Sequence, residues 1–169
     1  MLFIRDTKPE IYAKTHKFLN VLDYLNLKLT GEFVASFDSI VTSWVTDNRN
    51  PNELRYNDGL ISMLGLDRAK LPDVVSCSSV IGNLKTDVAS ALGLSSDIKV
   101  VAGSIDNTAA AIGSGAVEDF HPHLYIGTSS WITAHVPFKK TDIGSSLASI
   151  PCAVPDKYLL TALQATAGG

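Results

Sequence analysis

The stretch IKVVAGSIDNTAAAI, residues 98–112, decides the fold class of this chain. Its first five residues are largely apolar and predict a buried strand, and its last five, small and mostly apolar, predict a helix. Between them the chain passes through Gly103 to Asp106 and Asn107. Ligands of open α/β sheets bind at the carboxyl ends of the strands, so the sequence places a candidate site at this junction.

Asp106 and Asn107 are the residue types that such a site would use. A carboxylate can accept a proton from a substrate hydroxyl, and a side-chain amide can hydrogen-bond a neighbouring hydroxyl. Gly103 lets the backbone approach a ligand closely. The alternative is purely structural, because Asp and Asn are also favoured helix N-caps. From these residues alone, an N-cap at Asp106 is the more economical interpretation.

A second candidate is Gly-Thr-Ser-Ser at residues 127–130, which lies between two predicted strands, 124–126 and 131–136. A turn of small hydroxyl residues can direct backbone N–H groups and hydroxyls at phosphate oxygens. The alternative is an ordinary hairpin with a polar tip. The turn is not a P-loop, because no Gly-Lys-Ser/Thr follows a spaced glycine.

The rest of the chain predicts helices first and strands later. We expect a helix from Pro9 through Leu22, followed by a segment over 23–29 that fits either a helix or a strand and ends at Gly31. A turn over 47–52 precedes a helix over 52–64, which Gly65 closes. A further helix runs from an N-cap at Thr86 to Leu92 with Gly93 beyond it, and a strand is expected over 158–160. This order indicates an α/β or α+β protein.

Composition narrows the class of function. The 169 residues include 14 Lys and Arg against 17 Asp and Glu, a net charge of −3, and 46% of them are hydrophobic. This balance argues against a nucleic-acid partner or an anionic membrane surface, since both need clustered basic residues. No apolar run approaches a membrane span, and the first residues do not resemble a signal peptide, so we expect a cytoplasmic protein.

We predict no metal site, because His121 and His123 lack an obvious third ligand and Cys77 and Cys152 form no motif.

Taken in order, several segments resemble the FGGY family of carbohydrate kinases, and within it the branch labelled xylulose kinase. The segments are Pro9–Lys17, Asp23–Leu25, Leu29–Gly31, Leu64–Gly65, Leu71–Pro72, Val100–Gly103 with Asp106–Asn107, and Tyr125–Trp131. The resemblance covers nearly the whole chain, and its specificity comes from the order and spacing of these segments.

The resemblance implies part of an actin-like ATPase fold of the ribonuclease H-like type, with ATP bound between two domains. It implies that Asp106 is the general base that takes the proton of the sugar hydroxyl and that Asn107 contacts the sugar. Gly127, Thr128 and Ser129 would hold the phosphates of ATP, with Mg²⁺ bridging them. Phosphoryl transfer depends mostly on positioning and charge neutralisation, which such residues can supply. The expected partners are therefore a small sugar, xylulose or a related ketose or polyol, and ATP.

The departures from the family pattern indicate an internal fragment. The family's first phosphate loop would precede Pro9, its adenine motif would lie beyond Gly169, and the 127–131 loop ends in Trp rather than glycine. We therefore expect residues 1–119 to be the end of the sugar-binding domain and 120–169 the start of the nucleotide-binding domain. The alternatives are a non-catalytic or inactive binding module of the same fold and an inert piece with a bare apolar face, which would favour a homodimer.

Overall fold

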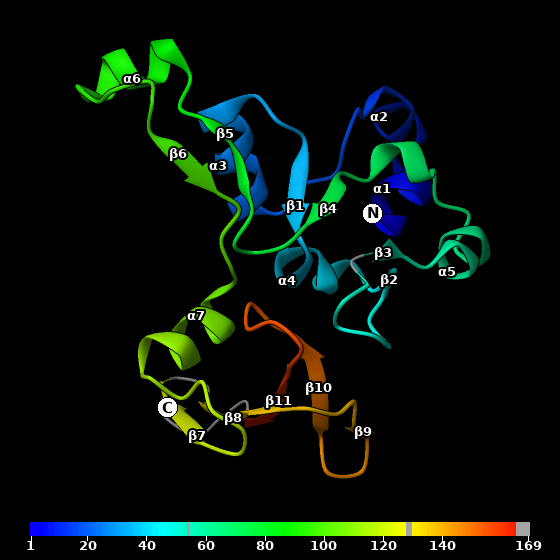
Figure 1. The fold of residues 1–169 in the computed structure, drawn as a ribbon. Helices are drawn as coiled ribbons and strands as arrows, with labels where there is room; N and C mark the ends of the chain where they lie inside the picture. The colour runs from blue at the N-terminus through cyan, green and yellow to red at the C-terminus, as the bar shows by residue number, and fades with distance from the viewer. Residues whose placement is uncertain (54, 128–129, 165–169) are drawn as a thin grey trace. The chain divides into compact units, whose positions relative to one another are not determined.

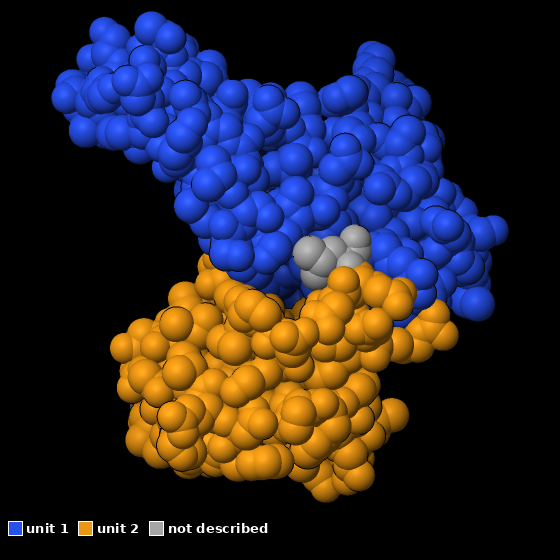
Figure 2. All heavy atoms as spheres, in the orientation of Figure 1, with its two compact units in different colours: residues 1–47, 54–103 blue, residues 48–53, 104–169 orange. Residues whose placement is uncertain are grey.

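The computed structural model describes residues 1–53, 55–127 and 130–164 (Figure 1). Residue contacts divide the chain into two compact units, coloured separately in Figure 2. Unit 1 comprises Met1–Asp47 and Leu54–Gly103, and unit 2 comprises Asn48–Glu53 and Ser104–Gly169. The mixture of helices with parallel and antiparallel strands confirms the predicted α/β class.

Unit 1 is built from short helices and two-stranded sheets. Its helices are α1 (Leu2–Thr7), α2 (Pro9–Lys14), α3 (Val21–Thr30), α4 (Phe37–Ile40), η1 (Val41–Ser43), α5 (Asp58–Met63), η2 (Arg68–Lys70) and α6 (Thr86–Leu92). Its strands are β1 (Val34–Ser36), β2 (Thr46–Asp47), β3 (Arg55–Tyr56), β4 (Asp73–Val75), β5 (Val80–Asn83) and β6 (Lys99–Val101). β1 pairs with β4 in parallel, whereas β2 with β3 and β5 with β6 are antiparallel.

The core of unit 1 gathers around β1 and α4. Its buried apolar residues are Ala35, Phe37, Ile40, Val45, Tyr56, Ile61 and Leu71. A polar network lies beside this core on α3. The buried Asp23 carboxylate accepts hydrogen bonds from Ser39 Oγ at 2.8 Å and from the Ser36 backbone N–H at 3.3 Å. Ser36 in turn caps α4, because its hydroxyl accepts the Ser39 backbone N–H.

The first predicted helix is wrong in its length. α2 ends at Lys14, because Thr15 is extended (φ −67°, ψ 125°), and the chain does not become helical again until Val21. Hydrogen bonds to a distant segment replace the helical ones: the Phe18 backbone N–H donates to Lys70 O at 2.8 Å, and Lys70 Nζ donates to Thr15 O at 2.7 Å. Phe18 and Leu19 therefore lie in a non-helical segment, and Leu22 belongs to the next helix, α3.

Two other helices differ from the prediction at their starts. α5 begins at Asp58 rather than near Asn52, because residues 55–56 pair with β2 and the Asn57 side chain caps the helix by accepting the Leu60 N–H at 3.0 Å. In α6 the N-cap is Lys85 rather than Thr86, and Thr86 is the first helical residue.

Glycine positions were predicted more accurately. Gly31 (φ 90°) and Gly93 (φ 68°) are the left-handed C-caps of α3 and α6. α3 also settles the ambiguous segment 23–29, which is helical throughout. These caps confirm that a glycine after a run of helix-forming residues predicts the helix end.

The strand over 98–102 is confirmed as β6, but the prediction that it is buried is wrong. Val101 keeps 46% of its surface exposed, because β6 forms only an antiparallel ribbon with β5 among the described residues. Burial begins just past the strand end, where Ala102 is 1% exposed. The buried residue is therefore Ala102, which directly follows β6, and the chain enters unit 2 at Ser104.

Unit 2 consists of one helix and an antiparallel sheet in its described part. The elements are α7 (Asp106–Gly113), β7 (Pro122–Ile126), β8 (Ser130–Val136), β9 (Thr141–Asp142), β10 (Leu147–Pro151) and β11 (Tyr158–Gln164). The strand order is β7-β8-β11-β10-β9, so β11 returns to the centre of the sheet (Figure 1). α7 and the β7–β8 hairpin confirm the two elements that carry the predicted site residues.

Candidate functional site

The first part of the candidate site is the start of α7. Gly103 adopts φ +80°, a left-handed conformation that favours glycine, and Ile105 is the extended N-cap of the helix (φ −71°, ψ 162°). Three alanines and the buried Thr108 then continue the helix. This local sequence places Asp106 and Asn107 in the first turn of α7.

Asp106 is exposed to solvent and lies at the first helical position. The N-cap interpretation of this residue is wrong, because Ile105 holds that position and makes no side-chain cap bond. Asp106 Oδ1 instead accepts the Asn107 backbone N–H at 2.8 Å. An acidic group also interacts favourably with the positive end of the helix dipole here. The carboxylate therefore remains accessible to a ligand.

Asn107 lies beside it with its side chain partly buried. Its Oδ1 is buried and has no hydrogen-bond partner among the described residues. A buried acceptor without a partner costs free energy, about 1–3 kcal/mol for a neutral group. A ligand hydroxyl that donates to Asn107 Oδ1 would remove this cost. The first turn of α7 therefore carries a carboxylate and an unsatisfied amide oxygen on consecutive residues.

The second part of the candidate site is the β7–β8 hairpin. Leu124 pairs with Ile132 and Ile126 with Ser130, and the Tyr125 ring stacks on Trp131 with centroids 3.9 Å apart. Gly127 follows β7 directly and is half-buried. Thr128 and Ser129, the other two predicted phosphate-binding residues, lie outside the described residues. The hairpin prediction is confirmed, and the phosphate-binding role stays a prediction.

The structure joins only some of the predicted residues to one another. Asp106 and Asn107 share one helical turn and a hydrogen bond. Across residues 1–53, 55–127 and 130–164, no hydrogen bond or ion pair is seen between either of them and Gly127, although all three belong to unit 2.

No group of three metal-ligating His, Cys, Asp or Glu side chains is found in that same part of the chain. Within it, none of the helices is both long and apolar enough to cross a bilayer.

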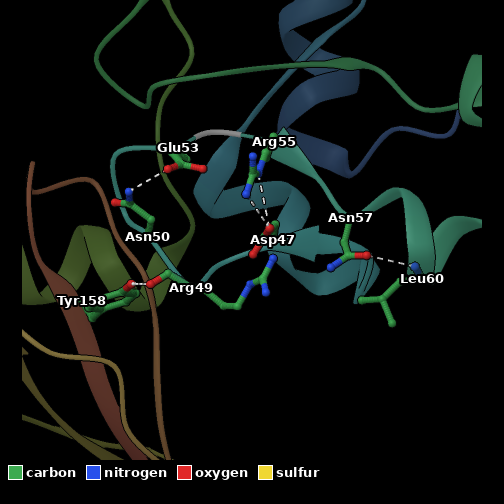
Figure 3. Close-up of polar contacts among 8 residues, drawn as sticks. All are labelled: Asp47, Arg49, Asn50, Glu53, Arg55, Asn57, Leu60 and Tyr158. Carbon is green, nitrogen blue, oxygen red and sulfur yellow. Dashed lines mark hydrogen bonds and ion pairs between the residues drawn. The ribbon is translucent and has the colours of Figure 1, made fainter.

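The turn over 47–57 carries polar contacts that the sequence analysis missed (Figure 3). In unit 1, Arg55 Nε and Nη2 donate to the buried Asp47 carboxylate at 3.2 and 3.0 Å. In unit 2, Tyr158 Oη donates to the Arg49 carbonyl at 2.7 Å, across 109 residues of sequence. The cluster of Asn and Asp predicted a turn, but nothing local could show that a strand tyrosine holds it.

Comparison with known proteins gives consistent results. Residues 1–113 match the model of the FGGY family of carbohydrate kinases, N-terminal domain. The xylulose kinase of Escherichia coli is 33% identical over 130 residues, which are 76% of this chain and 26% of the relative. That of Lactococcus lactis is 27% identical over 137 residues, which are 81% of this chain and 27% of the relative. The crystal structure of a xylulose kinase from Brucella ovis has a TM-score of 0.89 at 25% identity and covers 98% of this chain and 34% of that one. The chain thus spans about a quarter to a third of the length of these proteins.

Proposed function

The chain belongs to the FGGY family of carbohydrate kinases, and on that premise we propose that it is part of an enzyme that transfers the γ-phosphate of ATP to a sugar hydroxyl. Xylulose or a related ketose or polyol is the proposed acceptor, supported by the names of the relatives. The match ends at residue 113 and so includes Asp106 and Asn107.

The observation that carries the proposal is the first turn of α7. Asp106 has an accessible carboxylate, and the next residue, Asn107, has a buried amide oxygen without a partner among the described residues. A polyhydroxylated substrate suits this pair, because one hydroxyl can donate to Asn107 while its neighbour meets Asp106.

In the proposed mechanism, Asp106 is the general base. Its Oδ1 is held by the Asn107 N–H, so Oδ2 is the oxygen that takes the proton as the sugar oxygen attacks the γ-phosphorus. The hydrogen bond at Oδ1 fixes the carboxylate plane, and Asn107 Oδ1 orients the sugar. Positioning of this kind supplies much of the rate enhancement in phosphoryl transfer.

The phosphates of ATP are proposed to lie against residues 127–129. Gly127 lacks a side chain, so its backbone can approach a phosphate oxygen. Mg²⁺ would neutralise charge on the β- and γ-phosphates. This ion usually keeps several waters and binds through one or two carboxylates and the phosphates, so a protein cluster of three ligands is not required.

Three further parts of the proposal concern the whole protein. We propose that residues 1–119 close the sugar-binding domain and that residues 120–169 open the nucleotide-binding domain. The boundary between the compact units lies at residues 103–104, and the family match ends at residue 113. Both lie close to the proposed domain boundary at residues 119–120. We also propose that the whole protein is cytoplasmic and forms a homodimer.

The direct test is a substrate screen on the uninterrupted gene product. ADP release is measured with ATP, Mg²⁺ and a panel of ketoses, aldoses and polyols. The expected result is turnover with xylulose or a close relative among the best substrates. Absence of turnover with every sugar would contradict the proposal and leave a non-catalytic binding module, for which calorimetry with the same ligands is the test.

A further inference from the structure

An aromatic pair joins the two strands of the β7–β8 hairpin within unit 2. Tyr125 on β7 and Trp131 on β8 are direct cross-strand partners. Their rings lie nearly parallel, with centroids 3.9 Å apart and an interplanar angle of 9°. Aromatic side chains at opposed positions stabilise the pairing of their two strands. The stack therefore holds the last part of β7 against the first part of β8.

This pair lies next to the last pair before the turn. Ile126 pairs with Ser130, so the chain crosses from one strand to the other in three residues, the first of which is Gly127. A glycine backbone has a wide choice of conformations, because no Cβ restricts it. The position of the Gly127 backbone therefore depends on how firmly the two strand ends are paired.

Stacking, and not a hydrogen bond, holds the indole ring. Trp131 Nε1 is buried and has no hydrogen-bond partner among the described residues. Its neighbour on the other side is Leu163 of β11, whose side chain is 57% exposed. β7 is an edge strand of the described sheet, and Tyr125 on it is 41% exposed. Loss of the stack should therefore loosen the end of β7 without disturbing the central strands.

We propose that Tyr125 and Trp131 are a positioning pair for the phosphate-binding turn. Neither ring contacts the nucleotide: the pair keeps the ends of β7 and β8 together, so that the Gly127 backbone meets a phosphate oxygen of ATP. The inference rests on the proposed function, since it assigns the pair to the proposed phosphate site. It requires two flat rings and not the indole N–H, because that N–H binds nothing in the described part of the chain.

Kinetics of the uninterrupted gene product test the proposal with Trp131→Ala and Trp131→Phe. We expect Trp131→Ala to raise KM for ATP about 5- to 50-fold and to keep KM for the sugar within about twofold, because the residues proposed to bind the sugar lie on α7. Trp131→Phe keeps a flat ring, so its KM for ATP should stay within about threefold of the wild-type value. Tyr125→Ala removes the other ring from the exposed edge strand and should reproduce the effect of Trp131→Ala.

Leu163→Ala is the matched control, because it removes the other cross-strand neighbour of Trp131 and leaves the stack in place. Its KM for ATP should stay within about twofold of the wild-type value. An equal rise of KM for ATP in Trp131→Phe and Trp131→Ala would overturn the positioning role and assign the effect to the indole N–H. An equal rise in Leu163→Ala, or an unchanged KM for ATP in Trp131→Ala and Tyr125→Ala, would also overturn it.

Amide hydrogen exchange of the 169-residue chain gives a second readout that does not depend on turnover. Peptides that cover residues 122–127 should exchange faster in Trp131→Ala than in the wild type, Trp131→Phe or Leu163→Ala. Unchanged exchange in Trp131→Ala would overturn the positioning role. A wild-type gene product that phosphorylates no sugar would instead contradict the proposed function, whatever the exchange shows.

Discussion

His135 shows how a single buried residue couples this fold to pH. The ring is 0% exposed, and its Nδ1–H donates to the Ala116 carbonyl at 2.6 Å. Burial lowers the pKa of this histidine, and Lys157 lowers it further, against opposing contributions from the Ala116 hydrogen bond and Asp119. Nε2 has no hydrogen-bond partner among the described residues, so a proton added there would be buried without one.

This arrangement predicts the direction of a pH effect on stability. The folded-state pKa lies below the ordinary value near 6.5, so the unfolded chain binds the proton first as pH falls. The free energy of unfolding should therefore decrease below about pH 6.5, by at most about 1.4 kcal/mol per pH unit for one proton. Melting temperatures from pH 5 to 8 check this. His135→Gln should remove that part of the slope, and His121→Gln, an exposed ring, should keep it.

Asp106 and Asn107 show what could be predicted of the candidate site. Asp106 stood out because Gly103 and a small-residue helix mark a strand-to-helix junction, which is a local signal. The burial of Asn107 Oδ1 could not be predicted, because it depends on tertiary packing.

At the scale of elements, the ends of α3 illustrate what glycine contributes. Gly31 adopts φ +90° and a Cβ there would meet nothing within 4 Å, so the backbone conformation alone opposes substitution. Gly31→Ala should lower the free energy of unfolding by about 1–2 kcal/mol. Gly113→Ala is the matched control, because that glycine is helical and its surroundings are equally open. It should be neutral or stabilise by up to about 1 kcal/mol. Equal effects of the two substitutions in urea unfolding would contradict the account.

β11 allows a similar comparison within one strand. Leu159 is 0% exposed at the centre of the sheet, whereas Leu163 on the same strand is 57% exposed. Leu159→Ala should cost about 2–5 kcal/mol of stability through lost packing and the cavity left behind. Leu163→Ala should change it by less than about 0.5 kcal/mol. Chemical denaturation of both variants tests the placement of β11, and a larger loss in Leu163→Ala would refute it.

The elements that were predicted well are those decided locally. Gly31 and Gly93 end helices through their own left-handed backbone conformation, which does not depend on distant residues. The hairpin around Gly127 follows from two apolar runs and a short polar turn. The segment 15–20 was mispredicted because its hydrogen bonds to residues 70–71, from the Phe18 backbone N–H and the Lys17 side chain, outweigh its helical spacing. β9 and β10 were not predicted, since their pairing partners decide them more than their own short sequences do.

At the scale of the whole molecule, unit 2 bears an apolar patch on one sheet face. Leu124 and Ile132 are cross-strand partners, 60% and 49% exposed, and Ile126 on the same face is 71% exposed. The 169-residue chain should therefore associate as its concentration rises. Sedimentation velocity should show a lower association constant for the double variant Leu124→Thr, Ile132→Thr. Ile143→Thr, which removes a 90% exposed side chain outside the patch, should have no effect. A chain that stays monomeric at every concentration would disprove this role of the patch.

The central claim is that Asp106 is the base of a sugar kinase, and one substitution tests it most directly. Asp106→Asn keeps the shape of the side chain and removes its ability to take a proton. In the uninterrupted gene product, kcat for the best sugar should fall about 10²- to 10⁴-fold while KM for that sugar changes little. A variant that keeps wild-type kcat would contradict the account.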